Sequence, residues 1–382
     1  MKAPVFVALA FAPPRAAGIA AAALAACGLA LASTGAQAGY NFVTIIDPAD
    51  KPFAPPPPPP AMAVTFTNLL GINNSDLIAG FYGSGQAKDP NTGFLLTLPN
   101  NFMPENFPPP SMQTQMTGLN DNGTFVGYNY FTNGGMSVDN QFGFYLKGGV
   151  FHPVNNPNTP TSPPSGILIE NQLLGVTNND LAVGFYNSVG MDATGNHPVS
   201  HGYTYNIATN TFSANIDDPN ASLTNGGTVA AAINNSGEIV GFYKDSSGET
   251  HGFLDIGGSF TTVDGPGVTS TGQTQLLGLN DQGLAVGFYQ VNANDILHGF
   301  VFDSVHDTFT TVDPPGSAGT TLNGINDLDQ IVGFFVDGMG NTDGLLANPI
   351  PEPSTWAMML AGFTSLACLA FWRSRRVARV AA

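Results

Sequence analysis

Histidine and carboxylate side chains are the residues of this chain whose types and spacing could bind a metal ion. His197 and His201 lie four positions apart with Asp192 nearby, and together they could offer ligands to a metal ion. However, His201 shares its place in a repeated pattern with His251 and His298, each of which begins a His-Gly-Tyr or His-Gly-Phe sequence. A residue that recurs at one repeat position favours packing or hydrogen bonding at the start of a strand. The sequence therefore predicts no metal-binding residue.

Motifs for covalent or hydrolytic catalysis are missing from the sequence. It contains neither G-x-S-x-G nor H-E-x-x-H, and its two cysteines, Cys27 and Cys368, lie in apolar terminal segments. The Asn-Asp-x-Gly turns lack the remaining ligands of a calcium loop. Asp and Glu residues could form a glycosidase pair, but nothing in the sequence distinguishes two of them. We therefore predict no catalytic and no cofactor-binding residue.

Charge is distributed very unevenly along the chain. Between Gly39 and Pro351 the basic residues are four lysines, with no arginine, whereas all but one of the 27 acidic residues lie there. Such a surface repels phosphate backbones, so we expect no nucleic-acid partner. The missing arginines also exclude the bidentate carboxylate recognition that an arginine triad provides.

Six related segments run through the chain, and Gly278–Tyr289, with the sequence GLNDQGLAVGFY, is typical of them. The copies recur every 46 to 57 residues, in the range of propeller and array repeats. Each copy predicts a half-buried strand, an Asn/Asp/Gly turn, and a Val/Ile-rich strand that ends in glycine and two aromatic residues. The other copies begin at Gly71, Gly118, Gly175, Ala232 and Gly324.

The fifth copy contains four extended runs, which is the strand content of one propeller blade. The predicted strands are Gln275–Asn280, Leu284–Gln290, His298–Asp303 and Thr308–Asp313.

The last copy lacks the fourth run, because it reaches Pro349 without a Phe-Thr-Thr-Val-Asp sequence. An unassigned strand, Phe42–Asp47, precedes the first copy and would complete the last blade if the blades form a closed ring. The sequence thus predicts an all-β fold, a six-bladed β-propeller-like repeat domain closed by an N-terminal strand. A β-solenoid and paired β-sandwiches are the alternatives.

Loops that vary between the copies mark the mouth of the ring where a ligand is expected. They are the proline-rich insertions Phe107–Ser111 and Asn155–Ser165 and the loop Asn187–Ser200. The polyproline segment Pro55–Pro60 is predicted to be a stiff connection between strands.

The repeats resemble the HAF-type extracellular repeat, in which a G-[IL]-N-[DN]-x-G-x-[IV]-V-G core precedes H-[AG]-F. Gly278–Gly287 with His298–Phe300 matches this pattern, and the third copy departs from it at Thr177. The resemblance covers about residues 64–348 and implies an extracellular location, without an assigned activity.

The amino terminus has the features of a secretory signal peptide over residues 1–38. Lys2 and Arg15 precede an apolar run, and Ala36-Gln37-Ala38 predicts cleavage before Gly39. Leu24 to Gly28 also resembles a lipobox, which would leave a lipidated Cys27, and this alternative stays open.

The carboxyl terminus, residues 349–382, combines three elements in order. Pro351-Glu352-Pro353 precedes an apolar run, Trp356–Trp372, that predicts a single transmembrane helix, and Arg373, Arg375 and Arg376 follow it. The three elements together resemble a PEP-CTERM sorting signal. The resemblance implies recognition by exosortase, a membrane transpeptidase, and removal of the segment after the tripeptide. It also implies a Gram-negative bacterium that makes exopolysaccharide.

These features predict an exported envelope or extracellular-matrix protein, held by its C-terminal helix until it is processed. The predicted repeat domain, 39–348, would bind or scaffold, with polysaccharide as the ligand considered. A secreted carbohydrate-active enzyme with a carboxylate pair in the mouth of the ring is one alternative. A structural surface protein without a small ligand is another.

Overall fold

The computed structural model describes residues 39–49, 66–83, 91–111, 113–133, 136–162, 164, 168–192 and 195–350, with the isolated positions 362 and 364. The predicted signal peptide and the segment Pro55–Pro60 lie outside the described residues, and so does the predicted membrane helix apart from those two positions. Within the part of the chain that is described, no helix is long and apolar enough to cross a membrane.

The described repeats are built of β-strands, each group of which forms an antiparallel sheet in chain order. The groups are β2 (Thr67–Ile72), β3 (Leu77–Tyr82), β4 (Thr92–Thr97) and β5 (Asn101–Pro104); β6 (Gln113–Leu119), β7 (Thr124–Asn133), β8 (Met136–Lys147) and β9 (Val150–Val154); β10 (Asn171–Val176), β11 (Leu181–Asp192), β12 (Gly195–Asn206) and β13 (Thr211–Phe212); β14 (Gly226–Ile233), β15 (Ile239–Lys244), β16 (Thr250–Ile256) and β17 (Ser259–Val263); β18 (Gln273–Leu279), β19 (Leu284–Gln290), β20 (His298–Asp303) and β21 (Thr308–Thr311); and β22 (Gly319–Ile325), β23 (Ile331–Val336) and β24 (Thr342–Pro349) with β1 (Tyr40–Ile45). Short parallel pairings of β12 with β14 and of β16 with β18 join three of these groups into one larger sheet.

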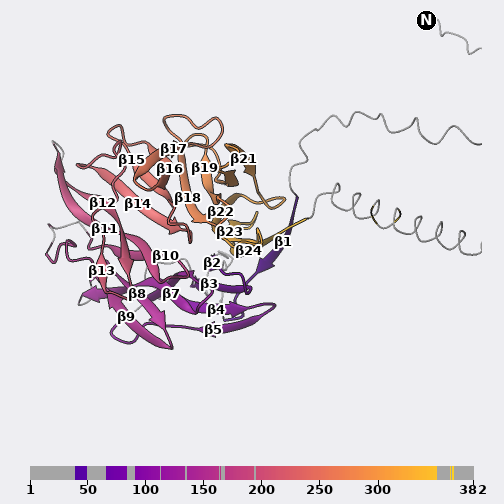
Figure 1. Cartoon of the computed structure of the whole chain (residues 1–382), viewed down its shortest axis with the longest axis horizontal. Helices are drawn as coiled ribbons and strands as arrows, with labels where there is room; N and C mark the ends of the chain where they lie inside the picture. The colour runs from indigo at the N-terminus through magenta and orange to yellow at the C-terminus, as the bar shows by residue number, and fades with distance from the viewer. Residues whose placement is uncertain are drawn as a thin grey trace, which may run out of the picture. The chain divides into compact units, whose positions relative to one another are not determined.

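The amino-terminal strand completes the last group. β1 pairs antiparallel with β24 along its whole length, from Tyr40 opposite Pro349 to Ile45 opposite Gly344, and Figure 1 shows the two strands side by side. The predicted pairing of this segment with the last repeat is therefore confirmed, although the strand begins and ends two residues earlier than Phe42–Asp47. Asp47 lies beyond the strand, where its backbone N–H donates to the Thr67 hydroxyl at 3.2 Å.

The first strands of successive groups lie against one another, β2 beside β6, and so on to β22, which lies beside β2. Glycine makes this close approach possible, since a Cβ on Gly71 would lie 3.1 Å from the Cα of Gly118. Between the last and first copies, a Cβ on Gly324 would lie 3.0 Å from the Cα of Gly71. A side chain at these positions would push the strands apart.

The hydrophobic core is divided into clusters, each shared by neighbouring groups of strands. One cluster contains Leu69 and Phe94 of the first copy together with Val332 and Leu346 of the last, and Ile45 of β1 belongs to it. Each of these side chains is at most 4 % exposed. Aliphatic and aromatic side chains that alternate along each strand thus bury both faces of most sheets against their neighbours.

The prediction of a loop over Asn187–Ser200 was wrong. Residues 187–192 and 195–200 instead extend the hairpin of β11 and β12, with Asn187 opposite Ser200 and Asp192 opposite Gly195. The ladder satisfies the backbone groups of this segment, so its polar composition did not prevent strand formation. The hairpin of β7 and β8 is long in the same way.

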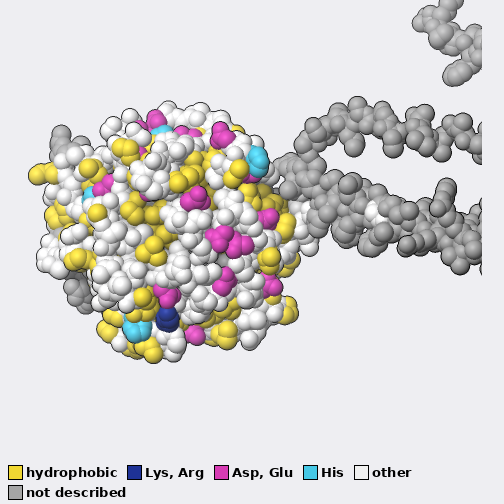
Figure 2. All heavy atoms as spheres, viewed as in Figure 1, with side chains coloured by type: hydrophobic (Ala, Val, Ile, Leu, Met, Phe, Trp, Pro, Cys, Tyr) yellow, Lys and Arg dark blue, Asp and Glu magenta, His cyan; other side chains and the backbone are white. Residues whose placement is uncertain are grey.

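Acidic side chains are spread over the surface, and on the face drawn in Figure 2 they far outnumber basic ones. One of the few lysines, Lys147, forms an ion pair with Asp180 at 2.5 Å. The described surface therefore carries the negative charge that the composition predicted.

Candidate functional site

A β-bulge recurs in every pair of first and second strands. In the first copy the register shifts between Leu69 and Gly71, so Leu70 is the extra residue, and the other copies shift at the equivalent place. A bulge redirects a side chain, and here each bulged residue lines a cavity enclosed by the first strands. We call these residues the bulge ring: Leu70, Thr117, Leu174, Ala231, Leu277 and Asn323.

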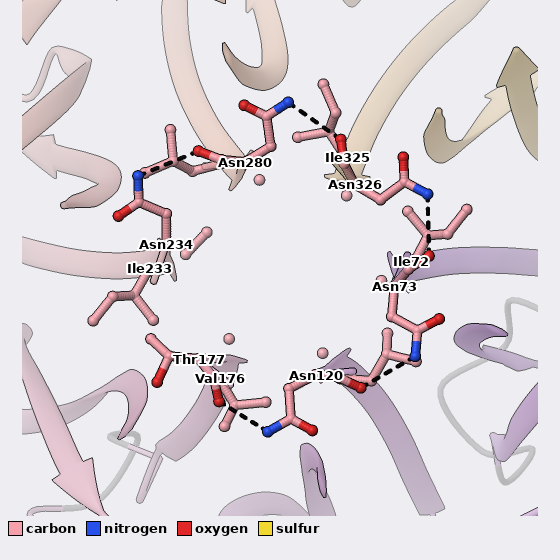
Figure 3. Close-up of a pocket in the computed structure, with 18 of the residues that line it drawn as sticks. Ile72, Asn73, Asn120, Val176, Thr177, Ile233, Asn234, Asn280, Ile325 and Asn326 are labelled. Carbon is pink, nitrogen blue, oxygen red and sulfur yellow. Dashed lines mark hydrogen bonds between the residues drawn. The ribbon is translucent and has the colours of Figure 1, made fainter. Parts of the chain in front are cut away.

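On the side of the turns that follow the first strands lies a chamber of about 120 Å³, here called the asparagine chamber. Its wall is a series of hydrogen bonds from one copy to the next, in which an Asn side chain donates to a backbone carbonyl (Figure 3). Asn280 Nδ2, for example, donates to the carbonyl oxygen of Asn326 at 3.2 Å. Thr177 interrupts the series because it has no amide. The other donors are Asn73 to Asn120, Asn120 to Thr177, Asn234 to Asn280 and Asn326 to Asn73.

The next residue of each turn forms a second cycle around the same chamber. The backbone N–H of Asn74 donates to Asp121 Oδ1 at 2.9 Å, and the last step, from the N–H of Asp327 to Asn74 Oδ1, measures 2.8 Å. The cycle returns to its starting residue, so the last copy contacts the first as every other copy contacts its successor. The intermediate steps are Asp121 to Asn178, Asn178 to Asn235, Asn235 to Asp281 and Asp281 to Asp327.

The carboxylates of this second cycle are occupied by hydrogen bonds. Asp281 accepts from the backbone and the side-chain amide of Asn235, both at 2.8 Å. Asp327 accepts from the N–H of Asp281 and from Asn74 Nδ2. The asparagine chamber is thus a closed polar frame in which acidic groups hold the copies together.

Beyond the bulge ring lies a larger chamber of about 250 Å³, here called the aromatic chamber. Its described lining contains aromatic rings, carboxamides and apolar side chains but no acidic or basic residue. Apart from the bulge ring, the lining consists of Asn68, Phe81, Gln115, Tyr128, Gln172 and Phe334.

Two polar groups distinguish the aromatic chamber from the asparagine chamber. Asn68 is 5 % exposed, and its Oδ1 atom has no hydrogen-bond partner among the described residues. A buried acceptor without a donor is costly, about 1–3 kcal/mol, so it is a strong sign of a ligand group or of water. Tyr128 donates its hydroxyl to Gln115 Oε1 at 2.5 Å, and burial, with Tyr130 close by, raises its pKa well above the usual value.

A polar network leads outward from the aromatic chamber between β8 and β10. Gln172 donates to Gln141, which donates in turn to the hydroxyl of Tyr130 at 3.5 Å. Glu170 accepts from the amide of Asn187. Burial raises the pKa of Glu170, and the hydrogen bond from Asn187 opposes that rise.

The repeated histidines lie at the starts of the third strands or within them, and each makes the hydrogen bond and the ring contact that were predicted for this repeat position. His201, His251 and His298 each direct Nδ1 to a carboxylate, that of Asp217, Asp264 or Asp313, at 2.8–3.0 Å. Each ring also packs against a tyrosine, with centroids 5.2–5.3 Å apart.

His197 and His201 do not converge on one point. Both histidines lie on β12, and four residues of a strand span about 13 Å, too far for both rings to reach one ion. His201 is in addition bonded through Nε2 to the Ser188 hydroxyl at 2.9 Å.

Most of the predicted processing residues lie outside the described residues, namely Ala36, Ala38, Pro351, Glu352, Pro353, Arg373, Arg375 and Arg376. Gly39 is described and exposed, and its carbonyl oxygen accepts from the N–H of Ile350 at 2.8 Å. The residue after the predicted signal-peptide cleavage point is therefore paired with the residue before the Pro-Glu-Pro sequence.

The chain carries a PEP-CTERM protein-sorting motif, since residues 349–376 match the family model of that motif. The motif implies recognition by exosortase, export across the inner membrane and a destination in the cell envelope or outside the cell. No curated protein matches the sequence significantly.

Several solved structures of β proteins are similar to this chain at low identity. Trypanosoma rangeli sialidase with the inhibitor DANA has a TM-score of 0.46 and 9 % identity over 86 % of this chain and 62 % of the sialidase. A polysaccharide lyase of family PL25, an ulvan lyase bound to -[GlcA(1-4)Rha3S]-, has a TM-score of 0.45 and 11 % identity over 74 % of this chain and 78 % of the lyase. A variant of the Aleuria aurantia lectin with α-methyl-L-fucoside has a TM-score of 0.46 and 8 % identity over 75 % of this chain and 92 % of the lectin.

This chain spans about three fifths of the length of the sialidase. At TM-scores below 0.5, none of these likenesses assigns an activity to it.

The residues that line the aromatic chamber were not predicted from the sequence. The available signal was the position before the first glycine of each copy, which reads Leu, Thr, Leu, Ala, Leu and Asn while its neighbours repeat. Asn68, Gln115 and Gln172, two residues earlier, carry amides in three successive copies and gave a second signal.

Proposed function

We propose that residues 39–348 form a six-bladed β-propeller of HAF-type repeats, closed by β1. The hydrogen bonds from the last copy to the first support this, as does the hydrophobic cluster that joins Ile45 to both copies. Deletion of residues 42–47 should then expose the edge of β24 and lower the melting temperature clearly. An unchanged melting temperature would argue against closure of the ring by β1.

We further propose that the chain is an exosortase substrate of a Gram-negative bacterium, exported by the signal peptide at 1–38 and held by a membrane helix at 356–372 until processing. The sorting motif at 349–376 supports this proposal. Replacement of Pro351, Glu352 and Pro353 by alanine should leave an unprocessed, membrane-held form, visible as a larger band in the membrane fraction. Normal processing of that variant would rule out the Pro-Glu-Pro sequence as the recognition element.

The role that we propose for the propeller is non-catalytic binding of a neutral sugar unit of polysaccharide in the aromatic chamber. The observation that carries this proposal is Asn68 Oδ1, a buried acceptor that finds no donor in the described part of the chain and belongs to a residue lining a chamber of carboxamides and aromatic rings. Sugar hydroxyls donate hydrogen bonds and sugar ring faces pack on aromatic side chains. A volume of about 250 Å³ suits one sugar residue, at a chain end or on a side branch, rather than an extended chain.

Charge supports the choice of a neutral ligand and of binding without catalysis. The described lining of the aromatic chamber offers no cation for an acidic polysaccharide and no carboxylate pair for hydrolysis. The aspartates of the asparagine chamber accept structural hydrogen bonds. The sparse basic residues also argue against a nucleic-acid partner.

A glycan-array screen of the exported protein tests the proposal, with Asn68→Leu as the decisive variant. This variant removes the unsatisfied acceptor, so it should abolish retention of the glycan while the free energy of unfolding stays constant or rises. Gln275→Leu is the matched control, since Gln275 occupies the same repeat position but does not line the chamber. Equal retention by Asn68→Leu would exclude the aromatic chamber as the site.

Turnover of a retained glycan would favour the carbohydrate-active enzyme instead. Glu170, the acid nearest in sequence to the lining residue Gln172, is the residue to test in that case. Activity that disappears in Glu170→Gln would overturn the proposal of a binding protein.

A further inference from the structure

Two hairpins of this chain have turns of the same backbone geometry, but the fifth residue of the turn differs between them. One connects β15 to β16 through Asp245–Glu249, and the other connects β23 to β24 through Asp337–Asn341. In both, the aspartate N–H donates to the carbonyl four residues on at 3.0 Å, and a glycine with a φ of 86–87° follows three residues after the aspartate.

The aspartate of each turn is fixed in the same way. Oδ1 of Asp245 accepts from the backbone N–H groups of Ser247 and Glu249, both at 2.8 Å. Oδ1 of Asp337 accepts from Met339 and Asn341 at 2.8 and 2.9 Å. In both turns the second carboxylate oxygen, Oδ2, is therefore held in a defined direction.

The side chain next to the Oδ2 atom differs between the two turns. In the second turn, the amide of Asn341 donates to Asp337 Oδ2 at 2.8 Å, and this hydrogen bond lowers the pKa of Asp337. In the first turn Glu249 replaces the asparagine and offers a second carboxylate instead of a donor. Among the described residues, Asp245 Oδ2 has no hydrogen-bond donor.

The side chain that faces both carboxylates is His251. Its Nε2 atom lies 3.9 Å from Asp245 Oδ2 and 3.8 Å from Glu249 Oε2. The other ring nitrogen, Nδ1, lies 3.0 Å from both oxygens of Asp264, and the ring packs on Tyr243. When Asp264 accepts the proton of Nδ1, the lone pair of Nε2 points at the two carboxylates, which is the carboxylate–histidine arrangement of metal sites.

We infer that Asp245, Glu249 and His251 form a binding site for a divalent metal ion of the Zn²⁺ class. Their three ligand atoms lie within 4.8 Å of one another. Bonds of about 2.0–2.1 Å in a tetrahedral Zn²⁺ site place ligand atoms about 3.4 Å apart, so each side chain needs to move by only about half an ångström. The side chains are 21–31 % exposed, which leaves a coordination position for water.

Imidazole selects the class of metal. Ca²⁺ and Mg²⁺ take oxygen ligands, whereas a nitrogen with two carboxylates suits Zn²⁺ and its neighbours in the first transition row. The other repeated histidines do not offer the same set. His298 has one carboxylate near Nε2, that of Asp295 at 3.6 Å, and His201 has the Ser188 hydroxyl there.

Titration of the exported protein with Zn²⁺ by calorimetry, and with Co²⁺ by visible absorption, tests the site. One ion per chain should bind at pH 7, with the absorption bands of nitrogen–oxygen coordination for Co²⁺. Glu249→Asn, which copies the second turn, should weaken binding at least tenfold. The matched control, Asp337→Asn, removes an acid from the second turn and should bind as the unaltered protein does.

Melting temperatures of both variants separate loss of the site from loss of the fold. The inference is overturned if the unaltered protein binds no Zn²⁺, if Glu249→Asn binds it equally well, or if an excess of Ca²⁺ displaces Co²⁺. Because asparagine is compatible with this turn at position 341, Glu249→Asn is expected to fold.

Discussion

The two chambers of the central cavity are built by the same strands and differ in how their polar groups are satisfied. Around the asparagine chamber, amides and carboxylates of successive copies bond to one another in a cycle. Around the aromatic chamber, and among the described residues, Asn68 Oδ1 has no partner and Tyr128 donates its hydroxyl to Gln115 of its own copy. Where the copies agree in sequence, polar groups satisfy each other and hold the ring. Where they differ, Asn68 Oδ1 is left without a donor among the described residues.

The two chambers should also differ in whether a substitution affects stability or binding. The bonds of the asparagine chamber join copies that are 46 or more residues apart, so their loss should weaken the whole domain. Asn68 Oδ1 at the aromatic chamber, by contrast, accepts no hydrogen bond from the described residues, so its loss should cost little stability. Substitutions at the asparagine chamber should therefore lower the stability of the domain, whereas substitution of Asn68 at the aromatic chamber should lower glycan binding.

The largest effect is expected at the asparagine chamber, from Asn280→Ala. Asn280 is 3 % exposed, donates to the carbonyl of Asn326 and accepts from the N–H of Leu284 at 2.9 Å. Its loss leaves several buried groups unsatisfied and should lower the free energy of unfolding by about 2–4 kcal/mol, measured by denaturant titration. Asn294→Ala, at an exposed position, is the control. A loss of under about 1 kcal/mol would mean that the cycle does not hold the ring.

The next effect should appear in both binding and stability. Tyr128→Phe removes the hydroxyl bonded to Gln115 and should weaken glycan binding about tenfold, equal to about 1.4 kcal/mol. It also leaves the buried Gln115 Oε1 without this donor, so the free energy of unfolding should fall by about 1–3 kcal/mol. Tyr289→Phe is the control, because its hydroxyl faces Thr311 on the outer part of a sheet. If both variants bind alike, the aromatic chamber does not contact the ligand.

A smaller, stabilising effect should follow from repair of the interrupted cycle. Thr177→Asn supplies an amide that can donate to the carbonyl of Asn234, as in the other copies. Thr177 Oγ1 now accepts from the N–H of Leu181 at 3.1 Å, and an asparagine Oδ1 takes that role elsewhere. The free energy of unfolding should rise by about 1 kcal/mol. A decrease would show that the interruption is required for packing at this place.

The smallest effect is a change in the pH dependence of stability through Glu170. Burial raises the pKa of this carboxyl in the folded protein, so the folded state holds its proton more tightly than the unfolded state. The contribution of Glu170 to the free energy of unfolding is therefore fully present below the pKa of the unfolded state. It is lost as the pH rises through the pKa of the folded state.

Glu170→Gln removes that dependence. The variant should match the unaltered protein near pH 4 and should be more stable at pH 7, by about 1 kcal/mol or less. Melting curves at the two pH values measure the difference. Greater stability of the variant at pH 4 than at pH 7, relative to the unaltered protein, would contradict this assignment.

Strand identity could be predicted well from single copies. The predicted strands Leu284–Gln290 and His298–Asp303 coincide with β19 and β20. The turn between β18 and β19 lies where Gly283 adopts a φ of 82°. Alternating apolar residues and turn-forming Asn, Asp and Gly act over a few residues, so they are visible in the sequence.

The candidate site could not be predicted in the same way. A β-bulge adds one residue to the ladder without a distinctive residue type, so the orientation of Leu70 or Thr117 followed only from the observed register. The distal part of the hairpin of β11 and β12, residues 187–200, was predicted to be a loop because this segment varies between the copies, whereas cross-strand pairing satisfies its backbone.

The sequence by itself determined the repeats, the strand content, the orphan first strand that pairs with the last copy, and the sorting motif. Each depends on residues close together in the chain or on the recurrence of one pattern. Tertiary structure alone decided which side chains meet at the centre and that Asn68 Oδ1 finds no donor among the described residues. It also decided that ligand atoms of Asp245, Glu249 and His251 lie within 4.8 Å of one another. These outcomes depend on register and on contacts between copies, in which a shift of one residue turns a side chain to the other face.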